Sequence, residues 1–444
     1  MAPRSLLRIA LGVTALLLPA AVLGGAAAAT PGDDTPLMWR VPVTGNQAAQ
    51  LVSAGFDVAE SGGDGSVFVV GNQTTATVLR QLGYQPTVHD TIYKDLPSAA
   101  EQRSLAGDTF YGGYHTVPAQ EAHLRQVASA HPDLATTYDV GDSWLKTKSK
   151  GGHDIQAICL TKKQSGDCEL TTNSKKPKFV LIAQIHAREI ATGELAWRWI
   201  DYLANGYGSD SQVKSILDST EVWVVPIANP DGVDIVASGG NSPKMQRKNA
   251  DNSRGGCTGT DVGIDLNRNS TFHWGGDSNS PCDETYQGQV KGSEPEVKGL
   301  ESFFRAIYPV QRGTGDNDPA PDTARGTMIT LHSYGNDIIV PWGWTEDPSP
   351  NDKALRALGQ KMAAGNGYVV DTNGGTVGYM TTGTTDDFTY GVLGVASYTI
   401  EVGPSSGGCG GFFPQFSCLD SKFWPEMKGA FTAAAVAAGA PYRQ

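Results

Sequence analysis

The sequence predicts an α/β fold in which a mixed, mostly parallel central sheet carries helices on both faces, preceded by a small α+β unit. The chain has 444 residues, which is too long for one average domain and enough for a large α/β unit plus a small one. From about Thr109 onward, apolar strand-like runs alternate with helical patterns. This alternation is typical of a largely buried, mostly parallel or mixed sheet that is covered by helices.

The first segment, residues 1–29, has the pattern of a secretory signal peptide. Arg4 and Arg8 precede the apolar run 11–23, and small residues end the segment at Ala29. A transmembrane helix is the alternative, but the run is short, and no later stretch reaches about 18 unbroken apolar residues. We therefore expect a secreted, extracellular protein with no membrane contact after the signal is cleaved.

The next segment, residues 30–108, is expected to hold the small α+β unit and a linker. Strand-like and helical patterns occur in turn at residues 38–43, 47–54, 66–70 and 74–82. No catalytic constellation lies there, and the stretch 94–108 is polar and broken by Pro97 and Gly107, which suits an exposed and cleavable linker. A propeptide removed by an activating protease fits these features. A permanent N-terminal accessory domain is the alternative.

The remainder, residues 109–444, carries the elements of the large unit. Strands are expected at residues 155–160, 179–185, 222–228, 328–331 and 396–400. Helices are expected at residues 120–129, 193–204, 294–307, 351–364 and 422–438. The stretch 313–326 is rich in Asp, Pro and Gly, so we expect a surface insertion there.

Charge and cysteine content limit the partners and the compartment. The net charge of −12 argues against a nucleic-acid partner, which would need a basic face. The six cysteines all follow the signal, and an exported protein with an even count is expected to bridge them, whereas a cysteine metal site would want a C-x-x-C spacing that is absent. Local pairing is one of fifteen possible connectivities. It would join Cys159 to Cys168, Cys257 to Cys282 and Cys409 to Cys418.

A candidate metal site lies where two predicted strands end. His186 and Glu189 form an H-x-x-E pair directly after the run 179–185, and a turn from strand to helix lets both side chains point at one ion. A catalytic zinc takes three protein ligands and leaves a position for water. His332 follows the run 328–331, so it would reach the same sheet edge, where open α/β sheets bind ligands. Taken alone, the pattern at His332 favours a hydrogen-bonded core histidine over a metal ligand.

Motifs along the chain carry a family resemblance. In chain order they are His186-Ala-Arg-Glu-Ile, Asn229-Pro-Asp-Gly, Arg247-Lys, Gly263-Ile-Asp-Leu-Asn-Arg-Asn, Pro281-Cys-Asp-Glu-Thr-Tyr, His332-Ser-Tyr and Tyr398-Thr-Ile-Glu. Across roughly Thr109 to Gly403 this order resembles the pancreatic-type zinc metallocarboxypeptidases, the carboxypeptidase A/B-like funnelins, in the form of secreted preproenzymes. The resemblance implies one zinc ion per chain bound by His186, Glu189 and His332, because His₂Glu is the zinc set known for carboxypeptidase A. It also implies peptide or protein C-termini as substrates.

The resemblance further assigns roles at the reacting bond. Glu401 occupies the family's general-base position and would take the proton of the zinc-bound water. Arg247 matches the arginine that stabilises charge on the carbonyl oxygen, with an ordinary surface arginine as the alternative. Asp265 matches the acid that orients the first zinc histidine through its second ring nitrogen.

Substrate recognition is assigned in the same way. Asn267 and Arg268 match the family's clamp for the terminal carboxylate, since a planar guanidinium and an amide offer several directed donors. Arg188 matches a further substrate-binding arginine. Tyr379 matches a mobile tyrosine that closes over the substrate terminus, with an exposed loop tyrosine as the alternative.

Side-chain selectivity depends on one position. Asp386 falls where the family selects the terminal side chain, and an acid there goes with Lys or Arg. The adjacent Asp387 also matches a family aspartate, so a slip of one residue would remove the argument. Two other functions remain: an exported peptidase or amidase of the same fold that acts on cell-wall peptides, and a catalytically inactive module that binds peptides. Loss of the base or of a ligand would mark the inactive module, and neither residue is lost.

Overall fold

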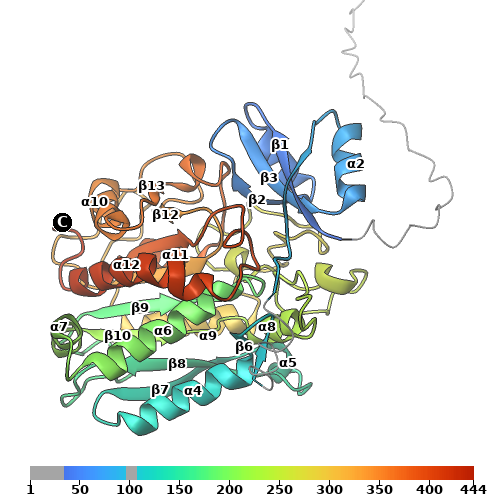
Figure 1. Cartoon of the computed structure of the whole chain (residues 1–444). Coiled ribbons are helices and arrows are strands. Elements are labelled where there is room, and N and C mark those ends of the chain that lie inside the picture. Colours follow the sequence, from blue (N-terminus) through green and yellow to red (C-terminus); the bar gives the residue numbers. More distant parts are fainter. Residues whose placement is uncertain (1–34, 97–107) are drawn as a thin grey trace, which may run out of the picture.

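The structure, a computed structural model, describes residues 35–96 and 108–444. Residues 35–96 form the N-terminal unit, which lies against one end of the main unit, residues 108–444 (Figure 1). The expected signal peptide, residues 1–29, and most of the expected linker lie outside the described residues. Within the part of the chain that is described, no helix is both long enough and apolar enough to cross a membrane.

The N-terminal unit is a four-stranded antiparallel sheet in the order β2-β3-β1-β4 with two helices. Its elements are β1 (Leu37–Pro42), α1 (Gln47–Ser53), β2 (Asp57–Ser61), β3 (Ser66–Gly71), α2 (Gln73–Gln81) and β4 (Thr87–Thr91). The sequence patterns indicated β1, β3 and both helices. They missed β2 and β4, which are polar strands; in β2 one of the two inward side chains is the carboxylate of Glu60.

The main unit is built on an eight-stranded sheet in the order β13-β12-β14-β11-β9-β10-β8-β7. Its strands are β7 (Ala135–Asp142), β8 (Asp154–Leu160), β9 (Lys178–Ile182), β10 (Glu221–Val225), β11 (Thr327–His332), β12 (Asp337–Ile339), β13 (Val369–Asp371) and β14 (Ala396–Glu401). The central strands β14, β11, β9 and β10 are parallel, whereas β12 pairs antiparallel with β14, and β8 pairs antiparallel with β10 and β7. The prediction of a mixed, mostly parallel sheet is confirmed. A short hairpin, β5 (Thr109–Phe110) with β6 (Tyr114–His115), precedes it.

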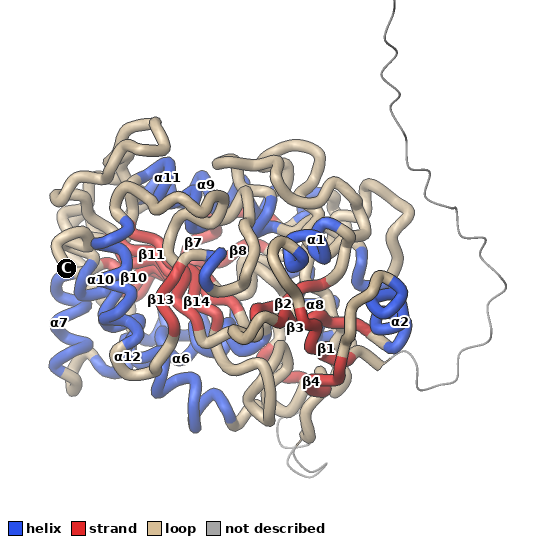
Figure 2. The backbone as a smooth tube through the Cα atoms, turned by 90° about the horizontal axis from the view of Figure 1, so that it is seen from above, coloured by secondary structure: helices blue, strands red, loops and turns tan. Residues whose placement is uncertain are grey.

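Helices cover both faces of this sheet, as predicted. The helices are α4 (Val117–Ala130), α5 (Trp144–Thr147), α6 (Ile190–Gly206), α7 (Ser211–Ser219), α8 (Pro230–Ala237), α9 (Pro295–Ile307), α10 (Asp352–Ala363), α11 (Thr385–Leu393) and α12 (Trp424–Ala437). Alternate residues of β9 enter two different cores: Leu181 packs in the core that contains α6 and α12, and Val180 in the core that contains α9 and α11. Figure 2 shows the sheet between these two helix layers.

Several element boundaries differ from the predicted ones. The apolar run 179–185 is a strand only to Ile182, because the chain then leaves the sheet through Gln184, whose φ is +48°. The H-x-x-E pair therefore lies in a loop that ends where α6 begins at Ile190. The sequence patterns also missed α11, since it buries the carboxylates of Asp386 and Asp387 and so lacks the usual separation of polar and apolar faces.

Covalent links and one long loop complete the main unit. The three local disulfides form as expected, and every cysteine of the chain takes part in one. The stretch 313–326 is a loop without helix or strand, and its origin as an insertion stays a prediction. It is anchored by Arg312, whose guanidinium donates to the carbonyls of Gly315 and Asp318, and Ala320 and Ala324 are buried.

Candidate metal centre

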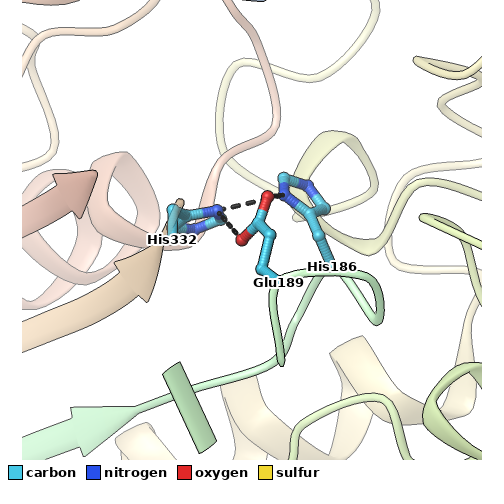
Figure 3. A group of neighbouring side chains, drawn as sticks. All are labelled: His186, Glu189 and His332. Carbon is cyan, nitrogen blue, oxygen red and sulfur yellow. Dashed lines mark hydrogen bonds and ion pairs between the residues drawn. The ribbon is translucent and has the colours of Figure 1, made fainter. Parts of the chain in front are cut away.

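The three candidate ligands come from two adjacent parallel strands. His332 is the last residue of β11, and β9, which pairs with β11, leads into the loop that carries His186 and Glu189. Because parallel strands end at the same edge of a sheet, the two segments meet there. All three side chains are buried, and Figure 3 shows them converging on one point.

The ligand atoms of the three residues lie within 4.8 Å of one another. Nδ1 of His186 is 2.8 Å from Oε1 of Glu189, and Nδ1 of His332 is 3.2 Å from Oε2 of the same carboxylate. The two Nδ1 atoms are 3.0 Å apart. Two imidazole nitrogens and a carboxylate therefore face one small space.

The outer nitrogen of each ring is engaged elsewhere. Nε2 of His186 is 3.2 Å from Oδ1 of Asp265, and Nε2 of His332 is 3.2 Å from Oγ1 of Thr330. With the ring protons on the two Nε2 atoms, both Nδ1 lone pairs face Glu189, whose Oε2 receives no hydrogen bond although it is buried. Burial raises the pKa of Glu189, but the adjacent His186 and His332 outweigh it and hold the pKa below its ordinary value. Two unprotonated imidazole nitrogens and one ionised carboxylate are the donors that a zinc ion binds.

Asp265 connects the metal centre to Arg247. Oδ2 of Asp265 accepts from Nε and Nη2 of Arg247 at 3.0 and 2.8 Å, while Oδ1 faces His186. Burial raises the pKa of Asp265, but Arg247 and His186 outweigh it, so the pKa lies well below its ordinary value. This buried carboxylate orients one ligand and one arginine at once.

Glu401 lies beside the centre as the last residue of β14, paired in register with His332 of β11. It lines the same cavity as Glu189 and Arg247. Burial raises the pKa of Glu401 well above its ordinary value, and the nearby carboxylates of Glu189 and Glu60 raise it further. A carboxyl group at this place can exchange a proton with whatever occupies the cavity.

Two side chains of the short helix Leu266–Arg268 also line the cavity. Oδ1 of Asn267 accepts from the amide nitrogen of Thr385 at 3.0 Å, which leaves its Nδ2 as a donor toward the cavity. Arg268 donates from Nε to Asp277 at 3.0 Å and from Nη1 to the carbonyl of Asn267 at 2.9 Å. Its Nη2 makes no hydrogen bond within the described residues, so Nη2 and the Asn267 amide form a pair of donors.

The structure separates the two adjacent aspartates at the start of α11. Asp386 lines the cavity. Asp387 instead accepts from the amide nitrogen of Gly343 at 3.1 and 3.0 Å through its two oxygens. Burial, followed by the adjacent Asp386, raises the pKa of Asp387 well above its ordinary value. Of these two aspartates, Asp386 is thus the one that a ligand in the cavity would contact.

Two of the predicted substrate-binding residues contact the N-terminal unit. Tyr379 lines the cavity and is mostly buried, and its hydroxyl donates to the carbonyl of Val58 at 3.2 Å. Arg188 lies outside the metal cavity: it donates from Nη1 and Nη2 to both carboxylate oxygens of Asp57, at 2.7 and 2.8 Å, and stacks on Phe412 at 4.1 Å. Both side chains therefore donate hydrogen bonds to residues of β2.

Strand β2 closes the cleft. Val58 and Ala59 line the cavity, whose remaining volume is about 50 Å³. That volume holds a few water molecules but no peptide, since ligand sites usually measure about 300 Å³ or more. Glu60 is buried next to the cleft. Its carboxylate and that of Asp337 both lie close to Gly335, since a Cβ added to this glycine would be 2.5 Å from Oε2 of Glu60 and 2.7 Å from Oδ2 of Asp337.

The sequence patterns did not identify Asp57, Val58, Glu60 or Asp277. The first three are far from the main unit in the chain, and a polar five-residue strand has no signal that predicts its partner. Asp277 follows two glycines in a loop, and only its contacts with Arg268 and Thr382 distinguish it from a surface acid.

Comparison with known proteins agrees with this geometry. Residues 120–428 match the sequence model of the family described as zinc carboxypeptidase. A zinc carboxypeptidase of Saccharothrix mutabilis subsp. capreolus is 28% identical over 318 residues, which is 70% of this chain and 67% of that protein. Carboxypeptidase A1 of Rattus norvegicus is 26% identical over 322 residues, with the same two shares.

Solved structures share the fold. The crystal structure of carboxypeptidase A from Helicoverpa armigera superposes with a TM-score of 0.67 at 21% identity and covers 91% of this chain and 99% of that one. The crystal structure of thrombin activatable fibrinolysis inhibitor also gives 0.67, at 20% identity, and covers 93% and 100%. These shares exceed what the main unit alone can supply, so the likeness in fold includes the N-terminal unit.

Proposed function

The chain belongs to the zinc carboxypeptidase family, and we propose that it removes the C-terminal residue of peptides with Glu401 as the base, prefers C-terminal Lys or Arg, and is held inactive by its N-terminal unit. The observation that carries the proposal is one cavity in which the His186, Glu189 and His332 donors, Glu401, and the Asn267 and Arg268 donors all meet.

The residues around the metal centre divide the chemistry. Zinc, when bound by His186, Glu189 and His332, supplies a Lewis acid that polarises a carbonyl and acidifies a water molecule. Glu401 accepts the proton of the attacking water and passes it to the leaving amine, a role for which its place in the same buried cavity is suited. Arg247, oriented by Asp265, offers its guanidinium to the charge that grows on the carbonyl oxygen.

Restriction to a chain end follows from the donor pair. Nη2 of Arg268 and Nδ2 of Asn267 suit a carboxylate, which only a C-terminal residue offers on its main chain at this place. Tyr379 lies on the same cavity and would cover the bound residue once its hydroxyl leaves Val58.

The preference for a basic side chain rests on Asp386. Its carboxylate lines the cavity, whereas Asp387 is occupied by Gly343. The lining of the same cavity also includes neutral hydroxyls, of Thr381, Thr384 and Thr399, and the amide of Asn373. A Lys or Arg side chain would find one charged partner there, and an acidic side chain would be repelled.

The N-terminal unit has the contacts of an inhibitory propeptide. It occupies Arg188 with Asp57 and Tyr379 with Val58, and it leaves no room for a peptide. Cleavage in the segment between the units, near Asp108, would release it by the action of an activating protease. Three disulfides and the signal-peptide pattern support export to an oxidising compartment.

The test uses the full chain before and after limited trypsin digestion. Peptides that differ only in a C-terminal Lys, Arg, Leu or Phe are incubated with each form, and the released amino acids are measured. We expect release of single C-terminal residues by the digested form, fastest for Lys and Arg, loss of activity with a chelator, and recovery with added Zn²⁺. Release of no C-terminal residue under any condition would contradict the carboxypeptidase proposal. Cleavage of internal bonds would favour the alternative, an exported peptidase that acts on cell-wall peptides.

A further inference from the structure

Arg268, the charged half of the proposed carboxylate clamp, is bound from behind by a buried acid of the same unit. Nε of Arg268 donates to Oδ1 of Asp277 at 3.0 Å, and both side chains are 4% exposed. Because a guanidinium is planar, a bond at Nε and a second bond from Nη1 to the carbonyl of Asn267 define the orientation of the whole group. The remaining nitrogen, Nη2, is left without a partner among the described residues, and Arg268 lines the cavity.

The second oxygen of Asp277 is bound to another segment of the site. Oδ2 accepts from the amide nitrogen and the hydroxyl of Thr382, at 2.7 and 2.6 Å. The Thr382 hydroxyl oxygen in turn accepts from the amide nitrogen of Gly276 at 3.0 Å. Thr382 lies three residues after Tyr379, so one carboxylate joins the clamp to the base of the segment that carries the tyrosine.

Backbone contacts also join the segment that carries Arg268 to the segment that carries Tyr379. The amide nitrogen of Ser270 donates to the carbonyl of Gly383 at 2.9 Å, and a Cβ on Gly383 would lie only 2.5 Å from the carbonyl oxygen of Arg268. Gly383 also has a φ of +63°, a conformation that favours glycine. At Gly383, the segment that carries Tyr379 thus approaches the segment that carries Arg268 too closely for a side chain. Among the contacts named above, only Asp277 brings a charged group to this junction.

We propose that Asp277 is a positioning residue for recognition of the substrate carboxylate: it orients the Arg268 guanidinium and fixes the base of the Tyr379 segment against it. This inference rests on the proposed function and goes beyond it, because Asp277 touches no substrate. Its removal should weaken binding of a free C-terminal carboxylate without affecting the proton transfer at Glu401. In kinetic terms, the contact that Asp277 supports stabilises the bound substrate and the transition state by the same free energy. Such a contact lowers KM and leaves kcat unchanged.

The test compares four variants, produced as the full chain and activated by the same digestion: Asp277→Ala, Asp277→Asn, Thr382→Val and, as the control, Asp316→Ala. Asp316 is an exposed acid that pairs with His273 at 2.8 Å, outside the clamp. With a peptide that ends in Lys, we expect Asp277→Ala to raise KM about tenfold and to change kcat less than about twofold. Asp277→Asn keeps an acceptor for Nε and should recover part of the loss. Thr382→Val should raise KM about threefold, and Asp316→Ala should match the parent protein.

A binding readout separates positioning from a general structural role. In a Glu401→Gln background, affinity is measured by calorimetry for one peptide with a free C-terminus and for the same peptide as a C-terminal amide. We expect Asp277→Ala to reduce the preference for the free acid about tenfold while the amide binds as before. Equal losses for both peptides, or an unchanged KM for both Asp277→Ala and Thr382→Val, would overturn the inference. If the parent protein prefers the free acid but releases no residue, the catalytic proposal fails while this inference stands; if it shows no preference, the inference fails.

Discussion

The N-terminal unit and the main unit meet at one cavity but contribute opposite kinds of groups. The main unit supplies the metal donors, the base and two arginines, and its parallel strands β9, β11 and β14 determine their positions. The N-terminal unit supplies the carbonyl of Val58 and the carboxylate of Asp57, which accept from Tyr379 and Arg188, and it buries the carboxylate of Glu60 beside the cleft. All the candidate metal ligands lie in the main unit, and β2 of the N-terminal unit fills the space beside them, which fits the proposal that this unit controls access.

The two units also differ in what stabilises them. The main unit has two cores, one on each face of the sheet, and contains all three disulfides. The N-terminal unit has no disulfide, and its core around Trp39 and Val69 continues into Ile339 and Val377 of the main unit. Docking therefore completes the core of the N-terminal unit, while the main unit buries its own sheet on both faces.

The largest expected effect concerns the chemistry assigned to the main unit. Glu401→Gln keeps the shape of the side chain but removes the proton acceptor, so turnover of a C-terminal Lys peptide by the digested protein should fall about 10³-fold. Bound zinc, measured by mass spectrometry or atomic absorption, should stay at one ion per chain because His186, Glu189 and His332 are unchanged. Retained turnover would show that the base is another group.

The second effect tests whether the main unit alone selects the substrate. Asp386→Leu removes the acid proposed to pair with the terminal side chain, so the ratio of kcat/KM for C-terminal Lys to that for C-terminal Leu should fall about 100-fold. Asp387→Asn serves as the comparison, since Asp387 is bound to Gly343 and its protonated form is favoured. An unchanged ratio in Asp386→Leu would remove the argument for basic specificity.

The third effect tests closure by the N-terminal unit. Asp57→Ala breaks its two hydrogen bonds with buried Arg188, so the uncut full chain should gain about tenfold in peptide hydrolysis. Asp64→Ala is the matched control, because Asp64 pairs with Arg40 on the exposed side of the same unit. If uncut Asp57→Ala stays as inactive as the parent protein, this ion pair does not hold the cleft closed.

The fourth effect is a pH dependence of that closure. Burial raises the pKa of Asp337 from 3.8 to about 7, and burial followed by Asp337 raises the pKa of Glu60 well above 4.5. Docking favours the protonated forms, so it should be strongest below about pH 4 and should weaken as the pH rises toward 7. Basal hydrolysis by the uncut chain, relative to the digested form at each pH, should rise a few-fold over this range. A flat ratio in the parent protein, or the same rise in Glu60→Gln, would contradict this explanation.

The smallest effect concerns the main unit alone. His153 lies between Asp234, at 2.7 Å, and Glu121, at 3.0 Å. Its hydrogen bond with Asp234 raises the pKa from 6.5 to about 9 despite the opposing effect of burial. The stabilisation is fully present below pH 6.5 and is lost as the pH rises to about 9; because Asp234 is half exposed, it amounts to roughly 1 kcal/mol. Denaturant unfolding of the parent and of His153→Gln at pH 6 and pH 9.5 measures it, and an equal pH effect in both would exclude His153.

Sequence patterns predicted the main unit better than the N-terminal unit. The central strands are apolar on both faces, so β8, β10, β11 and β14 agree with the predicted runs to within a few residues. The edge strands β12 and β13 have three residues each, and β2 is polar, so their local signal is too weak. For the site, motif spacing indicated His186, Glu189, His332 and Glu401 among the cavity residues of the β9 loop, β11 and β14, but not Thr399. The substrate-binding role of Arg188 stays a prediction, and the contact that motif spacing did not predict is its ion pair with Asp57.

The sequence by itself determined the family, the sheet architecture and the donor set for the metal, because these depend on residue types at short or regular spacing. The structure decided among the fifteen possible disulfide connectivities. Only the tertiary structure decided which of Asp386 and Asp387 faces the cavity, what orients Arg268, and what fills the cleft. The pair of Asp57 and Arg188 spans 131 residues, and the pair of Tyr379 and Val58 spans 321. Contacts of this range arise from how two units pack, and packing leaves no periodic pattern in either segment.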